Sequence, residues 1–286
     1  MIWLTGNRGM LGSEVEEALI GASVPYMVSG SDVDITDYNR LNDFAGGNRI
    51  GWIINCSAYT AVDRAEDEKE KAFAINADGA GNIARVAAEK GAVLIHFSTD
   101  YVFNGEKDGP YTEEDRPNPA GVYGMSKFAG EERIRQTNPK HFILRTAWLY
   151  GKNGFNFVDT MLRLFSERDE VRIVADQWGS PTYAKDLAAA IITIVKGNSS
   201  KYGIYNFTNQ GRTNWHEFSI EIYARARHTG IINRDVRIVP VTTREYPTRA
   251  LRPKNSYLSK DKIQRELGIV CRPWKEALTE YLAIVK

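Results

Sequence analysis

The stretch IWLTGNRGMLG, residues 2–12, decides the fold. Its first four residues predict a buried strand, and the apolar spacing from Met10 to Ile20 predicts a helix directly after it. Between strand and helix lie three glycines, Gly6, Gly9 and Gly12, in the pattern G-x-x-G-x-x-G. Glycines at these positions allow a tight turn, let a diphosphate approach the backbone, and let helix and strand pack closely. The opening of the chain therefore predicts a dinucleotide-binding βα unit.

Short apolar runs continue to alternate with helical patterns through the first half of the chain. Uniformly apolar strands separated by helices are typical of a parallel sheet covered on both faces. The expected strands are 25–28, 52–56, 93–97 and 142–145, and the expected helices are about 66–90 and 123–136. The predicted fold class is therefore α/β, a Rossmann-type doubly wound parallel sheet with a smaller C-terminal substrate lobe.

The alternation loosens after Trp148. We expect residues 1–150 to form the NAD(P)-binding domain and residues 151–286 to form mainly the substrate-binding lobe. Elements near 171–195, namely the strand at 171 and the helix at 185, are expected to return to the first sheet. The other elements predicted here are helices 157–167 and 215–227, strands 204–207 and 236–241, and two terminal helices.

Composition excludes several classes of protein. The 286 residues include 37 Lys and Arg against 36 Asp and Glu, and this balance provides no broad basic face for nucleic acid. The longest apolar run, 187–195, is about half of the ~20 residues that span a bilayer. Cys56, Cys271 and the four histidines have no metal-ligand spacing. The sequence predicts a cytoplasmic protein without metal, membrane or nucleic-acid partner, and without a signal peptide before the first strand.

The cofactor is predicted from the end of the second strand. NAD-binding proteins usually carry an acidic residue there, but Ser29 and Gly30 occupy this place, with Asp32 and Asp34 slightly beyond. Arg8 is available to pair with a 2′-phosphate, because a guanidinium matches phosphate bidentately. The alternative is that Arg8 is a solvated loop residue. We expect NADPH and leave NADH open.

Tyr123 and Lys127 form a Y-x-x-x-K pattern at the start of the helix after the fourth strand. This spacing puts both on one helix face, where an ammonium is expected to lower the phenol pKa toward working pH. Thr99, or with less support Ser98, ends the fourth strand and is placed to hold a substrate carbonyl. The pattern predicts Tyr123 as a proton donor supported by Lys127, which also bonds the nicotinamide ribose. The alternative is a packing tyrosine and a solvated lysine.

Several longer stretches follow one another in a familiar order. They are TGNRGMLG, NCSAYTAVDRAE, AINADGAGNIA, STDYVFNG, VYGMSK, RTAWLYG, GSPTYAKDLA and RPKNSYL. Together they resemble the extended short-chain dehydrogenase/reductase superfamily and, within it, the dTDP-4-dehydrorhamnose reductase family. The resemblance implies that NAD(P)H reduces the C4 keto group of dTDP-4-dehydro-L-rhamnose, with the dTDP-sugar as substrate. A homodimer is compatible with it.

The resemblance also implies roles for individual residues. The catalytic triad by position is Thr99, Tyr123 and Lys127. The implied cofactor-binding residues, besides Tyr123 and Lys127, are Gly6, Arg8, Gly9, Met10, Leu11, Ala58, Tyr59 and Thr60, with Asp34 and Ile35 near the adenine. The implied substrate contacts, besides Thr99 and Tyr123, are Tyr101, Trp148 and Asn255. Simpler alternatives are a core position for Trp148, a helix cap for the segment 34–37, and a solvated helix start for Asp63, Arg64 and Glu66.

Three alternative functions stay open on the sequence. One is a nucleotide-sugar epimerase or dehydratase on the same fold, but Tyr101 stands where a dehydratase usually has a glutamate. Another is a reductase of a different 4-keto sugar. The third is a non-catalytic regulatory subunit that resembles the β subunit of methionine adenosyltransferase, against which the intact Thr99, Tyr123 and Lys127 argue.

Overall fold

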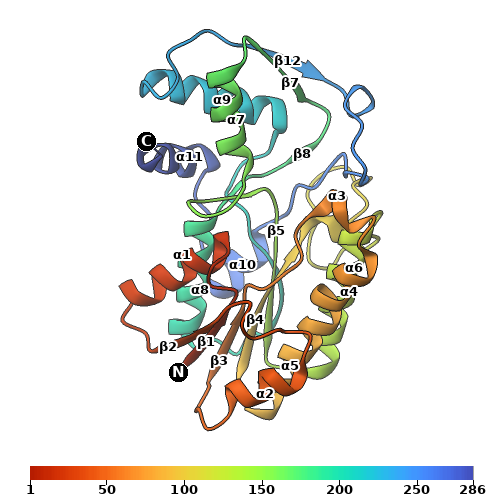
Figure 1. Ribbon diagram of the computed structural model, residues 1–286, viewed down its shortest axis with the longest axis vertical. Helices are drawn as coiled ribbons and strands as arrows, with labels where there is room; N and C mark the ends of the chain where they lie inside the picture. The colour runs from red at the N-terminus through yellow and green to blue at the C-terminus, as the bar shows by residue number, and fades with distance from the viewer. Residues whose placement is uncertain (286) are drawn as a thin grey trace.

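The computed structural model describes residues 1–285 and centres on a six-stranded sheet. The strand order is β10-β5-β4-β3-β1-β2, and all neighbouring strands run parallel (Figure 1). The chain winds outward in both directions from the pair β1 and β3, so the predicted doubly wound α/β class is confirmed. The strands are β1 Ile2–Thr5, β2 Tyr26–Ser29, β3 Trp52–Asn55, β4 Val93–Thr99, β5 His141–Thr146 and β10 Gly203–Asn206.

Helices cover both faces of this sheet. Alternate residues of β3 show the two layers, since Ile54 packs in the core with α1 and α8, whereas Ile53 packs in the core with α2 and α5. Both strand residues are fully buried, as expected for a parallel sheet between two helical layers. The helices are α1 Met10–Gly21, α8 Ala184–Gly197 and α10 Asp261–Leu267 on one side, and α2 Tyr38–Ala45, α5 Ala80–Glu89 and α6 Val122–Thr137 on the other.

The helix predicted over about 66–90 is wrong as a single element. The structure divides this region into α3 Val62–Ala65, α4 Lys69–Phe73, a π-helical turn Ala74–Gly79, and α5. Asn76 explains the widened turn, because its buried side chain accepts from the Tyr59 backbone N–H at 2.9 Å and donates to the Tyr59 carbonyl at 3.0 Å. A turn that directs a side chain to a neighbouring loop breaks the regular helical bonding.

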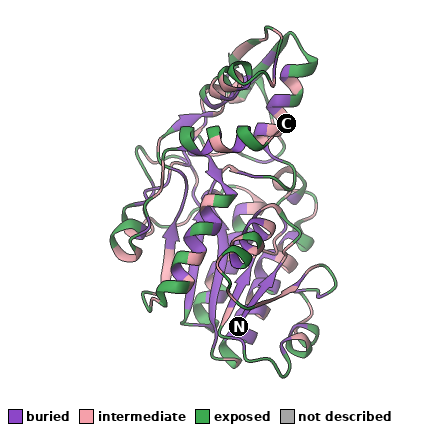
Figure 2. Cartoon of the chain, turned by 90° about the vertical axis from the view of Figure 1, so that its left-hand side faces the viewer, coloured by how far each residue is buried: buried purple, intermediate pink, exposed green. Residues whose placement is uncertain are grey.

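A smaller lobe follows the sheet domain. Its helices α7 Phe157–Glu167, α9 Trp215–His228 and α11 Trp274–Ile284 share one apolar core with strand β7, Glu170–Val174. Figure 2 shows buried strands in the sheet domain and exposed outer helix faces in both parts of the molecule. No helix among residues 1–285 is long and apolar enough to cross a membrane.

The strand near 171 does not return to the first sheet, so that prediction is wrong. Strand β7, Glu170–Val174, pairs in parallel with β12, Arg237–Val241, in a separate two-stranded sheet. Its residues alternate between exposed and buried, which suits a sheet with one covered face rather than the interior of the main sheet. Instead β10 pairs with β5 at the edge of the main sheet, and α8 packs against α1 as expected.

Short elements join the two parts of the molecule. They are the strand pairs β6 Leu149–Tyr150 with β9 Thr182–Tyr183 and β8 Trp178–Gly179 with β11 Thr213–Asn214, and the 3₁₀ turns η2 Asp100–Val102 and η3 Thr243–Glu245.

Candidate active site

A cleft of about 470 Å³ lies at the carboxyl ends of the central strands, where ligands gather in doubly wound folds. Its walls come from the sheet domain and from three later segments of the chain, represented by Phe155, Trp215 and Arg252. The cleft brings together most of the site residues predicted from the sequence. These are Gly9, Met10, Leu11, Ala58, Thr60, Thr99, Tyr101, Tyr123, Lys127 and Trp148.

Six predicted site residues do not line this cleft. Three of them have structural partners. Ile35 is buried in the core beneath α5, and the Asp34 carboxylate accepts from the Thr36 backbone N–H at 2.9 Å. The Asn255 side chain donates to the carbonyl oxygens of Lys107 and Gly109 at 2.8 and 2.7 Å. Of the others, Arg8 and Tyr59 directly adjoin cleft-lining residues in sequence, and Gly6 lies three residues before Gly9.

The glycine loop between β1 and α1 leaves its backbone open toward the cleft. Gly6 has a φ of 70°, and a Cβ atom at Gly12 would lie 2.1 Å from the Gly6 carbonyl oxygen. Among the described residues, no side chain caps the start of α1, and no acidic residue stands in its first turn. Uncapped N–H groups and the positive end of the helix dipole therefore face the cleft beside Gly9, as a diphosphate requires.

Arg8 extends from this loop over the end of β2. It is exposed, and its Nε atom would lie 3.8 Å from a Cβ atom placed on Gly30. Asp32 also approaches this point, because its carboxylate accepts from the Gly30 backbone N–H at 2.9 Å. The position at the strand end is therefore bordered by one guanidinium and one carboxylate.

The ammonium of Lys127 is buried beneath the cleft. Its Nζ atom donates to the Phe97 carbonyl oxygen at 2.6 Å, and the side chain belongs to a residue only 2% exposed. Burial lowers the pKa of Lys127 to about 8, although the negative charge of Glu131, one helical turn away, opposes this shift. Lys127 is thus held in place by strand β4 as well as by its own helix.

Tyr123 does not have the lowered pKa that its spacing from Lys127 predicts. Desolvation raises the pKa of Tyr123 above its usual value, and a hydrogen bond with the Thr99 hydroxyl only partly opposes the shift. The prediction is wrong because burial dominates and because Lys127 donates to the β4 backbone instead. A phenol with a raised pKa retains its proton at neutral pH, which suits a proton donor.

Thr99, the last residue of β4, forms hydrogen bonds with the turn that follows the strand. Its hydroxyl donates to Asp100 Oδ1 at 2.9 Å and accepts from the Tyr101 backbone N–H at 3.2 Å. The Tyr101 ring meets the Tyr123 ring edge-on, with centroids 5.6 Å apart. Gly124 permits this contact between η2 and α6, since a Cβ atom there would lie 2.2 Å from the Tyr101 carbonyl oxygen.

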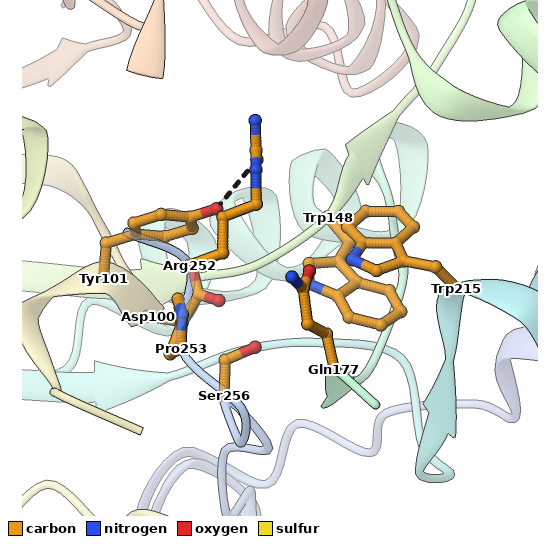
Figure 3. Close-up of a pocket in the computed structure, with 8 residues that line it drawn as sticks. All are labelled: Asp100, Tyr101, Trp148, Gln177, Trp215, Arg252, Pro253 and Ser256. Carbon is orange, nitrogen blue, oxygen red and sulfur yellow. Dashed lines mark hydrogen bonds between the residues drawn. The ribbon is translucent and has the colours of Figure 1, made fainter. Parts of the chain in front are cut away.

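The smaller lobe contributes an aromatic side chain, Trp215, and a cationic one, Arg252, that the sequence analysis did not single out. Trp148 has an unusual φ of 47° and stacks on Trp215 with ring centroids 3.7 Å apart. Arg252 donates to the Tyr101 hydroxyl at 3.1 Å (Figure 3). Trp215 and Arg252 come from segments about 70 and 100 residues beyond Trp148, so no local pattern links them to the site. Only the RPKNSYL stretch, whose first residue is Arg252, pointed to this part of the site.

The segment after β3 was read from the sequence as a solvated helix start, but two of its carboxylates have specific partners. Asp63 forms an ion pair with Arg252 at 2.7 Å. Glu66 accepts from the Val122 backbone N–H at 2.9 Å and so caps the helix that carries Tyr123. The helix start itself is confirmed, and Arg64 is exposed, but the interpretation missed the partners of Asp63 and Glu66 because both are distant in the sequence.

The family model described as RmlD substrate binding domain matches residues 1–286. A dTDP-4-dehydrorhamnose reductase of Aggregatibacter actinomycetemcomitans is 40% identical over 281 residues, covering 96% of each chain. This chain belongs to the dTDP-4-dehydrorhamnose reductase family. It is also 41% identical to the spore coat polysaccharide biosynthesis protein SpsK of Bacillus subtilis, over 98% of this chain and 96% of SpsK.

Solved structures of family members agree with the fold. A dTDP-4-dehydrorhamnose reductase of Clostridium acetobutylicum has a TM-score of 0.93 at 40% identity and covers 99% of both chains. The enzyme of Bacillus anthracis, crystallised with NADP, has a TM-score of 0.92 at 39% identity, covering 99% of this chain and 98% of that one. The dTDP-glucose 4,6-dehydratase DesIV of Streptomyces venezuelae, at 18% identity and a TM-score of 0.81, shares the fold.

Proposed function

We propose that this chain reduces the C4 keto group of dTDP-4-dehydro-L-rhamnose to give dTDP-L-rhamnose, with NADPH as the hydride source. The observation that carries the proposal is that one cleft joins the uncapped start of α1 to Thr99, Tyr123 and Lys127. A dinucleotide site and a proton donor in one cleft are the two parts that ketone reduction needs. The relatives named above support the nucleotide-sugar substrate.

The residues present fit a phosphorylated dinucleotide. The start of α1, with Gly9 beside it, is open to the diphosphate, and Arg8 is placed over the end of β2 to meet a 2′-phosphate. NADP in the Bacillus anthracis relative supports the same choice. NADH is the alternative, in which Asp32 at the strand end would face the ribose hydroxyls.

The chain's own residues then complete the reduction. The bound nicotinamide supplies a hydride to the carbonyl carbon. Tyr123 donates its phenolic proton to the carbonyl oxygen, and Thr99 orients that oxygen by a hydrogen bond. Lys127, buried and held on the Phe97 carbonyl, keeps a positive charge beneath the developing negative charge.

Arg252 suits the diphosphate of the nucleotide sugar. With Lys127 it supplies the cationic side chains among the described residues that line the cleft, and it donates a hydrogen bond to the Tyr101 hydroxyl. Its partner Asp63 is 42% exposed, so a ligand anion can replace that contact. The stacked Trp148 and Trp215 form the neighbouring wall.

The rival functions make different demands on the site. A dehydratase needs a further carboxylate after Asp100, where this chain has Tyr101. An epimerase recycles its hydride, whereas a reductase consumes one NADPH per sugar. A non-catalytic regulatory subunit would have no use for Tyr123, Lys127 and Thr99 in one cleft.

The cytoplasmic location and the homodimer stay predictions, to be checked by cell fractionation and by light scattering.

Replacing Tyr123 with phenylalanine tests the proposal. Wild-type protein should consume NADPH stoichiometrically with dTDP-4-dehydrorhamnose, and Tyr123→Phe should lower kcat by about 10²–10⁴-fold, because general acid catalysis contributes that much. Cofactor affinity, measured by calorimetry, should change little. Normal turnover by the variant would show that another group is the acid, and a wild-type protein that reduces no 4-keto sugar would refute the function.

A further inference from the structure

A buried ion pair joins helix α6 to strand β5, next to Lys127. The side chains of Glu131 on α6 and Arg145 on β5 are 0% and 1% exposed. The guanidinium holds both carboxylate oxygens, since Arg145 Nε donates to Glu131 Oε1 at 2.9 Å and Nη2 donates to Oε2 at 2.6 Å. Removing two charges from water is costly, and a buried ion pair is often no more stable than apolar residues of the same size. Stability alone therefore does not explain this pair.

Lys127 is close enough to Glu131 to compete with Arg145 for its carboxylate. Lys127 and Glu131 are four positions apart on α6 and both are buried, so they are neighbours on one face of the helix. The flexible four-carbon stem of a lysine can bring its ammonium to a carboxylate at this spacing. In this structure the ammonium instead donates to the Phe97 carbonyl oxygen at 2.6 Å, and Lys127 lines the cleft.

Arg145 has the advantage in this competition. A planar guanidinium binds both oxygens of a carboxylate at once, which an ammonium does not do. The positive charge of Arg145 also offsets the attraction between Glu131 and Lys127. Without Arg145, Glu131 would be a buried and unpaired carboxylate, and such a group binds an adjacent cation if one can reach it. Lys127 is adjacent and can reach it.

We propose that Arg145 is a positioning residue, which occupies the Glu131 carboxylate and so keeps the Lys127 ammonium directed to the cleft instead of into an ion pair on its own helix. The inference rests on the proposed function, in which Lys127 supports the reduction from beneath the substrate. It also gives Glu131 a role, because its fixed negative charge opposes the loss of the lysine proton in a buried site.

Other titratable groups lie on the elements that pack around Lys127. His96 on β4 stays neutral, because burial and the charge of Lys127 lower its pKa well below the usual value. Asp100 in η2 and Tyr123 on α6 line the cleft together with Lys127. These three groups are unchanged in the variants below, so a shift of the alkaline limb of activity reports on Glu131 and Arg145.

Two variants separate a positioning role from a purely structural one. Arg145→Met frees the Glu131 carboxylate, and kcat/KM at pH 7 should fall about 100-fold or more, because the lysine that supports the proton donor turns away from the cleft. The double variant Glu131→Met/Arg145→Met removes the competing carboxylate as well. It should recover kcat/KM to within about tenfold of the wild type, since apolar residues of similar size replace a buried ion pair well.

The pH profile and the position of Lys127 give readouts that a structural role would not change. The alkaline limb should move to higher pH in Arg145→Met, where Lys127 pairs directly with Glu131, and to lower pH in the double variant, where the charge of Glu131 is missing. A crystal structure of Arg145→Met should show the Lys127 ammonium on Glu131 and no longer on the Phe97 carbonyl oxygen.

An exposed pair on the same helix provides the matched control. Glu132 and Arg135 form an ion pair at 2.6 Å with side chains 38% and 52% exposed. Glu132→Met/Arg135→Met should change neither kcat/KM nor the alkaline limb. If the double variant at Glu131 and Arg145 keeps the wild-type limb, or is no more active than a folded Arg145→Met, the inference is overturned while the reductase function stands.

Further measurements keep the other failures apart. Thermal unfolding shows whether Arg145→Met is folded, and if it is not, the alkaline limb of the double variant decides. If the wild type reduces no sugar, the proposed function fails, and calorimetry with NADPH then applies the criterion to binding. Affinity should be weakest in Arg145→Met and regained in the double variant, and equal losses in both would count against the positioning role.

Discussion

At the scale of single residues, the site is governed by burial rather than by charge pairing. Lys127 contacts the backbone of β4, and Asp100 directly follows this strand. Burial favours the neutral form of each group, so it lowers the pKa of Lys127 to about 8 and raises the pKa of Asp100 to about 6. Both groups are therefore ionised together over a narrow range near neutrality. The spacing of Tyr123 and Lys127 predicted their meeting in one cleft, but it held no information on desolvation, which depends on the whole fold.

The pKa of Lys127 predicts an alkaline limit to activity. We expect kcat/KM to fall about tenfold per pH unit above pH 8, since the lysine loses the charge that supports the reaction. Lys127→Arg should have lower activity but no such limb, because arginine stays protonated. Initial rates from pH 6 to pH 10 with limiting sugar substrate measure this, and a flat profile to pH 10 would contradict it.

The raised pKa of Asp100 predicts that its buried carboxylate destabilises the folded protein above about pH 6. Its pKa is higher in the folded state than in the unfolded state, so its favourable contribution is present at low pH and lost as pH rises through about 6. A rise of the Asp100 pKa from 3.8 to about 6 corresponds to about 3 kcal/mol. Asp100→Asn should raise the free energy of unfolding by up to that amount at pH 8 and by little near pH 4, as measured by urea denaturation. A less stable variant at pH 8 would be the contrary result.

At the scale of elements, the strand–loop–helix unit at the start of the chain is the part that sequence predicts best. Strand 2–5 and the helix from Met10 lie where the pattern placed them, because a buried strand, three glycines and an amphipathic helix are all local signals. The region 66–90 was predicted poorly. In its π-helical turn, the Asn76 side chain forms hydrogen bonds with Tyr59, 17 residues earlier in the chain. The periodicity of apolar residues cannot reveal such a contact.

Two of the loop glycines should respond differently to alanine. A Cβ atom at Gly12 meets the Gly6 carbonyl oxygen at 2.1 Å, whereas one at Gly9 has its nearest neighbour at 3.5 Å. Gly12→Ala should therefore lower the free energy of unfolding by about 1–3 kcal/mol or more, as overpacking does. Gly9→Ala should fold normally and lose mainly NADPH affinity. Thermal unfolding and cofactor titration compare the two, and equal stability would contradict the packing explanation.

At the scale of the whole molecule, the smaller lobe closes one side of the cleft. Arg252 and Arg249 lie on one loop of this lobe and form ion pairs with Asp63 and Asp67 in the segment after β3. The sequence predicted two lobes and the sheet, but not this junction. It also misplaced strand 171–174, because a short strand carries no signal of which sheet it joins.

The two arginines form a matched pair for testing anion binding. Arg252 lines the cleft, whereas Arg249 does not, although both pair with an aspartate of the same segment. Arg252→Gln should weaken dTDP binding about 10–100-fold, as expected for a lost charge-assisted hydrogen bond. Arg249→Gln should leave dTDP affinity within about twofold. Calorimetry with dTDP measures both, and equal losses would mean that the loop contacts, not anion recognition, determine affinity.

The parallel indole rings of Trp148 and Trp215 have an optical consequence. Two indoles whose ring centroids lie 3.7 Å apart interact electronically, so their circular dichroism and emission should depend on how the rings are stacked. One ring belongs to the segment after β5 and the other to α9. Any ligand that separates or rotates the rings changes both signals, so the molecule carries its own spectroscopic probe of how the smaller lobe meets the sheet.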